Sequence, residues 1–388
     1  MGIPLNIQCY APGAGGVFST AYPLPDLKDR VDGYQHSISD HYGFESCTMS
    51  MHVALAEAMD WLRNGLMRSL VVTGPAGEIC WEGFLETVTV TVGQKKASLS
   101  LKNMANSVYF LWTTVEGTPG NIPSTPTTAS QLSQALYGRK DYLGALPNAL
   151  SSTVAAAAAR ILALLCFPRS AESTTAQTGG IGEITLELSF AGWYATLDWL
   201  LVSNNSVALT ATSTQLTATY LPGYATINAF LSTDYSGIAF TGPSMPAYVP
   251  NFSTYGQVIK RLLSVGDTSN RTLTYGVFEN RTFLVAPSAA NTPTVLTYQE
   301  DAGTGIILDA YGNVVKPWNV RPNAMSQVVQ LLDTTPVTGA TDSAAVKYVS
   351  RVVCGIQGDN IGCELEPSGA GGIDAILAAF PNPGWKGF

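Results

Sequence analysis

The sequence predicts an α+β fold that is mainly β, with sandwich or barrel domains that each carry one packed helix. A small helical insert and a C-terminal β region complete the expected architecture. Residues 87–92 and 184–190 alternate between apolar and polar side chains, which is the pattern of a half-buried strand. Residues 51–68 and 254–265 repeat apolar side chains at spacings of three and four, as an amphipathic helix does. Strands that alternate with single helices in this way indicate helices packed on sheets.

The N-terminal segment, residues 1–116, is expected to form the first β domain. After an irregular start and the helix at 51–68, the valines of segment 87–92 take one face and the threonines the other. Residues 93–96 can turn the chain into a second strand at 97–101, and residues 108–115 indicate a third.

Residues 117–182 differ in character and predict a linker followed by a helical insert. Prolines mark residues 117–128 as an exposed linker. Thr128 or Ser130 can cap a short helix to about residue 140, and Ser151 or Ser152 can cap an alanine-rich helix that ends before Pro168. We expect this second helix to pack on another helix of the same chain. Residues 170–182 form a second linker.

Residues 183–290 predict a second β domain, and residues 291–388 a C-terminal β region and tail. The strand at 184–190 is followed by a helix that Ser253 or Thr254 caps and Gly266 ends. A hairpin at 272–278 and 281–286 follows, then short strands at 305–308, 345–354 and 361–365, and one or two helical turns at 373–380. Because both β domains contain a helix followed by a hairpin, an internal duplication is a hypothesis.

The composition is poor in charge for a chain of 388 residues. Charged residues make up 12% of the sequence, against about 25% in typical soluble domains, and the net charge is −8. An acidic chain with few Lys and Arg residues does not suit a groove that binds nucleic acid by neutralising phosphates. The composition fits either an assembled protein whose surface is covered by partners or a secreted β protein rich in Ser and Thr.

The N-terminus lacks the basic and apolar regions of a signal peptide. The most apolar stretch, residues 154–167, is shorter than the roughly 20 residues that span a bilayer, so we predict a buried helix and no membrane span. Six cysteines lie far apart without a CxxC pair. We predict that the cysteines are free thiols and that the protein is made in a reducing cytoplasm, although Cys354 and Cys363 could face each other across a hairpin.

No catalytic, cofactor-binding or metal-binding residue is predicted. The three histidines, His36, His41 and His52, match no zinc-binding pattern. The sequence also lacks the GxSxG motif whose serine a catalytic histidine would activate. The glycine-rich segments 13–16 and 179–182 lack the GK[ST] of a phosphate loop. Paired carboxylates are the remaining enzymatic route.

Those carboxylates are Glu82 and Glu86, which flank Trp81 and Phe84, and Asp198, which precedes Trp199. Such a pair beside an aromatic platform can bind or cleave sugar. The even spacing of Glu82 and Glu86 equally suits a solvated strand face. A carbohydrate-binding or carbohydrate-degrading module is therefore kept as an alternative.

Several short motifs, taken in their order, resemble a known family. They are Trp61-Leu62-Arg63-Asn64-Gly65-Leu66, Ile79-Cys80-Trp81-Glu82-Gly83-Phe84, Ala105-Asn106-Ser107-Val108, Tyr137-Gly138-Arg139-Lys140, Gly192-Trp193-Tyr194-Ala195-Thr196-Leu197-Asp198-Trp199, Gly266-Asp267, Tyr275-Gly276-Val277 and Lys316-Pro317-Trp318-Asn319-Val320-Arg321-Pro322. The chain resembles structural tail proteins of long-tailed bacteriophages, in particular the baseplate hub or tail-tip type. The resemblance covers most of residues 30–365.

The resemblance implies a non-enzymatic virion protein, made in the host cytoplasm, that joins the tail tube to the tail tip. It implies a homotrimer in which each subunit contributes two tail-tube-like β domains to a pseudo-sixfold ring that lines the DNA channel. The implied partners are the tail tube or distal tail protein, other baseplate and tip proteins, the tape measure protein, and DNA that passes without specific binding. A neck or capsid adaptor is a further alternative.

Overall fold

The structure is a computed structural model. It describes residues 5–13, 18, 20, 23–27, 30–114, 119–120, 129–174, 184–202, 209–245, 253–287, 294–301, 304–320, 329–333, 345–357 and 360–368. The segments 14–16, 179–182 and 373–380, on which three of the sequence-based expectations fall, lie outside the described residues.

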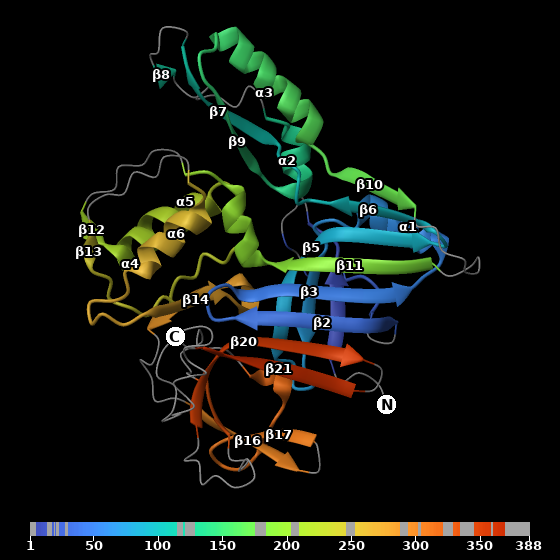
Figure 1. The fold of residues 1–388 in the computed structure, drawn as a ribbon, viewed down its shortest axis with the longest axis vertical. Coiled ribbons are helices and arrows are strands. Elements are labelled where there is room, and N and C mark those ends of the chain that lie inside the picture. The colour runs from blue at the N-terminus through green and yellow to red at the C-terminus, as the bar shows by residue number, and fades with distance from the viewer. Residues whose placement is uncertain are drawn as a thin grey trace, which may run out of the picture.

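One large, mostly antiparallel sheet dominates the molecule (Figure 1). Its central path runs in the order β1 (Asn6–Tyr10), β4 (Ser69–Thr73), β5 (Ile79–Val92), β11 (Ile184–Gly192), β3 (Gly43–His52), β2 (Val31–Ser39) and β20 (Ala345–Gln357). Beyond β20 the path continues through β19 (Val329–Asp333), β16 (Thr294–Asp301), β17 (Thr304–Leu308) and β18 (Val314–Val315). The fold is thus α+β and mainly β, which confirms the prediction.

Further strands extend this sheet at its margins. The strand β6 (Lys95–Ser100) pairs with β5 and with β10 (Arg169–Thr174), and β21 (Asn360–Ser368) pairs with β20. The hairpin β14 (Leu273–Val277) and β15 (Phe283–Pro287) contacts β3 through the bridge between Val277 and Gly43. A separate pair, β12 (Thr210–Ala211) and β13 (Ser244–Met245), lies near α4.

The large sheet combines strands from distant parts of the chain. The strand β11 belongs to the segment that we assigned to the second β domain, yet it lies between β5 and β3 of the first. The strand β20, from the C-terminal region, pairs with β2. The sheet therefore combines strands from several of the expected domains. The domain boundaries themselves stay a prediction.

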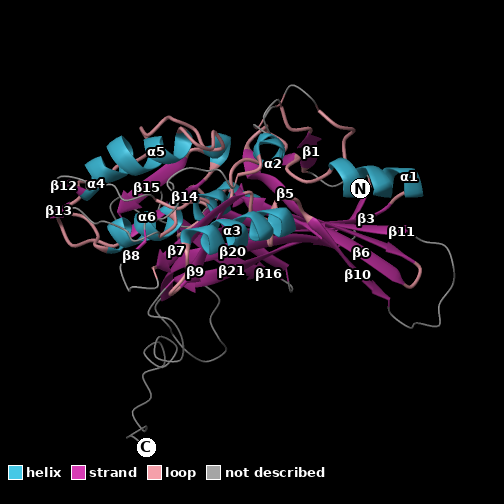
Figure 2. Ribbon diagram, turned by 90° about the horizontal axis from the view of Figure 1, so that it is seen from above, coloured by secondary structure: helices cyan, strands magenta, loops and turns pink. Residues whose placement is uncertain are grey.

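The helices that pack on the body are α1 (Leu55–Asn64), η2 (Trp193–Trp199), α4 (Thr212–Gln215), η3 (Leu216–Tyr220), α5 (Leu221–Ala225) and α6 (Tyr255–Ser264). In Figure 2, α1, α4 and α5 lie on one side of the strand layer. The capping prediction for α6 is confirmed, because the Thr254 side chain accepts the Gln257 N–H and Gln257 Oε1 accepts the Thr254 N–H. The helix α1 is shorter than predicted, because Met51 and His52 continue β3.

The insert is a mixed module rather than a helical one, which corrects the prediction. It contains β7 (Ser107–Thr113), β8 (Pro119–Gly120), β9 (Asp141–Leu146), α2 (Gln131–Tyr137) and α3 (Ser151–Leu165). The alanine-rich α3 packs mainly on the strand β7, with Val154 and Ala158 in one apolar cluster with Val108 and Phe110, rather than mainly on a helix as expected. The strand β9 does not show the alternation of apolar and polar residues that identifies a strand. One of its positions is Gly144, where a Cβ would clash with the Phe110 ring.

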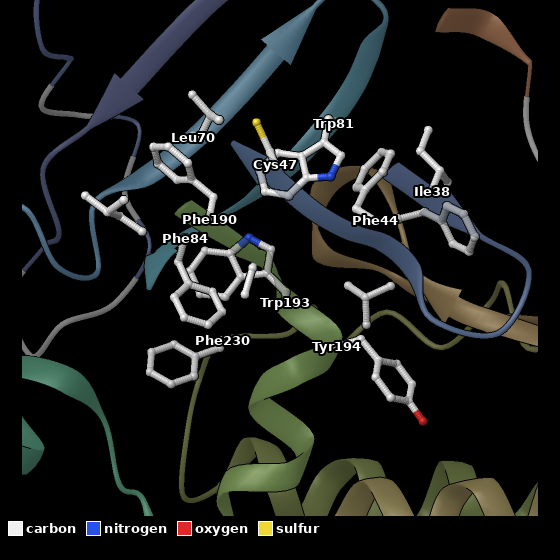
Figure 3. Packing of buried hydrophobic residues seen from close by; sticks show 14 of the residues in the cluster. Ile38, Phe44, Cys47, Leu70, Trp81, Phe84, Phe190, Trp193, Tyr194 and Phe230 are labelled. Carbon is white, nitrogen blue, oxygen red and sulfur yellow. The ribbon is translucent and has the colours of Figure 1, made fainter. Parts of the chain in front are cut away.

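The main core gathers aromatic side chains between the sheet and the segments that cover it (Figure 3). Trp81 and Trp193, from the resembling motifs, are both fully buried. Trp193 lies beside Phe84, with ring centroids 5.1 Å apart, and beside Phe230 at 5.7 Å. This cluster joins β5 to η2 and to the loop after α5, so it ties distant segments into one body.

Four cysteines, Cys9, Cys47, Cys80 and Cys166, are free thiols, as predicted. Cys354 is disulfide-bonded, so the prediction of free thiols is wrong at this residue. The β20–β21 register places Cys354 opposite Cys363. Within the described residues, no helix combines the length and apolar character that crossing a membrane requires.

Candidate functional site: a hydroxyl-rich sheet face

The large sheet has two chemically different faces, which follow from strict alternation along its central strands. Val88, Val90, Leu186 and Leu188 point inward and are buried. Their neighbours along the strands point to the opposite face, because successive side chains of a strand alternate. That opposite face carries mostly serine and threonine, and we call it the hydroxyl face.

The strand register aligns these side chains into rows that cross the sheet. One row pairs Ser98 with Thr89, Glu187, Ser50 and Gly33 in succession. The next row pairs Ser100 with Thr87, Ser189, Thr48 and Gln35. The hydroxyl face comprises Ser37, Ser46, Thr48, Ser50, Thr87, Thr89, Thr91, Ser98, Ser100, Thr185 and Ser189.

Hydroxyl groups on this face bond to one another across neighbouring strands. Thr87 Oγ1 lies 2.7 Å from Ser100 Oγ, and Ser37 Oγ lies 2.8 Å from Ser46 Oγ. Such cross-strand pairs stabilise the sheet by a few tenths of a kcal/mol to about 1 kcal/mol each. The face thus presents neutral groups that both donate and accept hydrogen bonds.

Several charged groups on this face form ion pairs, whereas Arg169 of β10, opposite Ser100, is an exposed cation at the end of a row. Lys96 Nζ lies 3.1 Å from Glu187 Oε2 in the middle of the sheet. Arg351 of β20 bonds to Glu45 of β3 at 2.8 Å and to Glu366 of β21 at 2.9 Å. Because opposite charges placed together partly cancel, these ion pairs attract mobile ions only weakly.

A shallow trough of about 430 Å³ crosses the hydroxyl face. Gly33 and Gly355 line it together with Gln35, Thr48 and Glu187. The trough exists because the two glycines leave gaps in rows that side chains fill elsewhere.

The three carboxylates considered for catalysis have separate structural roles. Asp198 Oδ1 accepts the Thr254 hydroxyl at 2.6 Å, at the start of α6, where a negative charge stabilises the helix. Glu86 lies 3.5 Å from Lys102. Glu82 is buried and contacts the turn between β14 and β15, so the solvated face expected for it is wrong.

The aromatic rings expected beside these carboxylates belong to the core. Trp81, Phe84 and Trp199 are all buried. A sugar ring stacks only on an exposed aromatic face. The described structure therefore brings together no carboxylate pair with an accessible aromatic platform.

The histidines lie apart and each has a local partner. His36 is buried and its Nδ1 lies 2.7 Å from the Tyr34 hydroxyl. His41 contacts Asp40 at 2.5 Å, and the hydrogen bond that the Asp40 carboxylate accepts raises the pKa of His41. His52 contacts Asp32 at 2.7 Å. Among the described residues, no group of three His, Cys, Asp or Glu side chains is placed to hold a metal ion.

A polar junction that the sequence analysis did not identify joins the insert module to the body. Asn228 binds the backbone of Arg139 on both sides, accepting its N–H and donating to its carbonyl, each at 2.9 Å. Asp141, whose side chain is fully buried, accepts from Arg139 Nε at 2.7 Å and from the Leu201 N–H at 2.9 Å. These contacts explain the Tyr137-Gly138-Arg139-Lys140 motif structurally.

Lys140 completes this junction. Its Nζ donates to the carbonyls of Leu101 and Lys102 and lies 5.1 Å from the centre of the Trp199 ring. Burial lowers the pKa of Lys140 to about 8. The junction is thus built from hydrogen bonds, whereas the module and the body each have an apolar cluster of their own.

No protein-family model matches the sequence, and no curated protein matches it. Solved structures do match. A tail protein from Neisseria meningitidis MC58 shares 9% identity, with 95% of this chain and 97% of that chain covered and a TM-score of 0.44. The 43 kDa tail protein of prophage MuSo2 from Shewanella oneidensis shares 6% identity, with 94% and 96% covered and a TM-score of 0.45.

A third similar structure is the Escherichia coli c3393 protein, a component of the type VI secretion system that is similar to the T4 bacteriophage tail proteins gp27 and gp5. It shares 7% identity, with 88% of this chain and 74% of that chain covered and a TM-score of 0.32. The first two of these proteins are described as tail proteins, and each match covers most of this chain. Because each TM-score is below 0.5, these matches assign no partner and no activity to it.

Proposed function

We propose that the chain is a non-enzymatic structural component of a bacteriophage tail, a baseplate hub that joins the tail tube to the tail tip. The observation that carries the proposal is the hydroxyl face. It is broad, uncharged over most of its area, and backed by an apolar core. A wall along which DNA moves must be wetted without retaining phosphates, and paired charges among hydroxyl groups meet this condition.

In the proposed assembly, three copies form a ring whose hydroxyl faces line the central channel. The tail tube or distal tail protein, the tape measure protein and other baseplate and tip proteins are the proposed partners. Closed cyclic symmetry is the usual solution for chains that cover apolar surface by assembly. The low charge content supports an assembled state, because a chain with few charged residues leaves much neutral surface for partners to cover. Obligate interfaces bury about 2,000 Å² or more of surface.

A reconstruction of the assembled particle tests this proposal. We expect threefold placement around the tail axis, with the hydroxyl face toward a channel wide enough for duplex DNA. Mass photometry of the purified protein is expected to show trimers, alone or with tail partners. A position away from the tail axis contradicts the hub proposal, and a dodecameric ring favours the neck or capsid adaptor.

The carbohydrate module is the weaker proposal, because the aromatic side chains expected to bind sugar are buried. Purified protein separates the two functions. Binding or cleavage of a polysaccharide by the wild-type chain favours the carbohydrate module, whereas a hub is expected to leave glycans unbound.

A further inference from the structure

Glu82 is a buried carboxyl that links β5 to a turn from a distant part of the chain. Its Oε2 accepts the N–H of Asn280 at 2.9 Å, in the turn η4 (Glu279–Arg281) between β14 and β15. Only 2% of the Glu82 side chain is exposed. The contact therefore connects the β14–β15 hairpin to β5 of the main sheet through one titratable side chain.

The turn that Glu82 contacts is held in an unusual backbone conformation. Asn280 and Arg281 have φ angles of 57° and 60°, in the left-handed region that non-glycine residues rarely adopt. Asparagine adopts this region readily, but Arg281 does so at a cost on the order of 1 kcal/mol or more, so neighbouring contacts must hold it. Arg281 supplies two of these contacts, since its carbonyl accepts the Ser232 N–H and its guanidinium donates to the Phe230 carbonyl.

The surroundings compensate a negative charge on Glu82 incompletely. Arg281 Nε lies 3.9 Å from Glu82 Oε1, which is too long for a hydrogen bond. Within the described residues, neither of these two atoms has a hydrogen-bond partner. A neutral carboxyl requires less compensation than a carboxylate, so this site favours the protonated acid.

We propose that Glu82 and the turn Glu279–Arg281 form a proton-sensitive latch, closed when the carboxyl is neutral and loosened when it is ionised. The charged groups that act on Glu82 are Arg281, which favours ionisation, and Glu279, which opposes it. Burial outweighs the attraction of Arg281 and raises the pKa of Glu82 to about 7. The latch thus loosens progressively as the pH rises from about 4.5 to about 7.

The sign of the effect follows from proton linkage. When the turn lifts from β5, Glu82 meets water and returns toward its ordinary pKa of 4.5. The closed form binds the proton more tightly, so its advantage is complete below pH 4.5 and is lost as the pH rises through about 7. With these two values, the ratio of open to closed turns rises about tenfold between pH 6 and pH 8.

Hydrogen exchange of the full chain tests the latch. The peptide covering residues 278–283 is followed at pH 6 and pH 8, with rates corrected for the intrinsic pH dependence of exchange. We expect protection in the wild type to fall about tenfold across this interval. In Glu82→Gln, whose side chain resembles the neutral acid, we expect protection to stay constant.

Glu86→Gln is the matched control, because Glu86 lies on the same strand and pairs with Lys102 at the surface. It is expected to behave like the wild type. Equal pH dependence in the wild type and Glu82→Gln overturns the proposal. If Glu82→Gln does not fold, an infrared or NMR titration of the wild-type carboxyl decides: a midpoint near 7 supports the latch, and one near 4.5 ends it.

Discussion

Trp193 contacts rings from three separate parts of the chain. The Trp193 ring lies 6.0 Å from Phe18, 5.1 Å from Phe84 and 5.7 Å from Phe230, measured between centroids. Aromatic pairs at such distances contribute about 0.5–1.5 kcal/mol beyond the area they bury. Trp193 therefore connects the N-terminal segment, β5 and the loop after α5 in one cluster.

We expect Trp193→Ala to lower the free energy of unfolding by about 3–5 kcal/mol, and Trp81→Ala to do the same. Trp193→Phe should cost much less, because the Trp193 indole N–H has no hydrogen-bond partner within the described residues. Urea unfolding measures these changes. Tyr311→Ala is the control, since Tyr311 is 90% exposed. Unchanged unfolding of both alanine variants contradicts the prediction.

At the scale of elements, two glycines of the motifs that resemble those of tail proteins lie where two backbone segments come very close together. A Cβ at Gly192 would lie 1.6 Å from the Phe44 carbonyl oxygen, and one at Gly276 would lie 2.2 Å from the Gly43 nitrogen. Both contacts are with backbone atoms, which cannot rotate away. These two glycines let β11 and β14 approach the residues at the start of β3.

We expect Gly192→Ala to destabilise the protein strongly, by about 3 kcal/mol or more, because the added methyl group must displace a strand. Gly355→Ala, on β20, is the matched control. A Cβ there meets its nearest atom at 3.6 Å, an ordinary contact. Thermal unfolding of both variants measures the difference, and equal midpoints would show that the close approach at Gly192 is not limiting.

Elements could be predicted from the sequence where a segment shows either the two-residue period of a strand or the 3.6-residue period of a helix, but not both. The strand β11 and the capped helix α6 were predicted because alternation and a capping residue are local signals. The strand β3 was missed although Ser46, Thr48 and Ser50 alternate with buried residues, because Met51 and His52 were assigned to the following helix. Two overlapping periods cannot be separated without knowing which strands pair.

The hydroxyl face was only half visible in the sequence for the same reason. The threonines of β5 and the polar positions of β11 were recognised, but their alignment with β3 and β2 depends on long-range register. The burial of Glu82 depends on a turn almost 200 residues further along the chain, at Asn280. No local pattern reports a contact of that kind.

At the scale of the whole molecule, the two faces of the large sheet divide the chain's tasks. The apolar face holds the core, and the hydroxyl face is the surface that we propose lines the channel of the assembly. If that face lines a DNA channel, its function depends on a low density of positive charge. Its chemistry can therefore be changed without changing the fold.

We expect Thr48→Lys combined with Gln35→Lys to leave folding and particle number unchanged but to slow DNA ejection several-fold. Both side chains are exposed and pair across β3 and β2, so longer side chains fit there. The added ammonium groups would bind phosphates, and because such binding releases counterions, higher salt should restore ejection. Thr48→Glu with Gln35→Glu should eject normally, since carboxylates repel DNA, and Ser264→Lys, exposed on α6, controls for added positive charge elsewhere. Ejection kinetics from purified particles at two salt concentrations measure the effect. If the lysine variant ejects at the wild-type rate in low salt, the hydroxyl face does not contact the moving DNA.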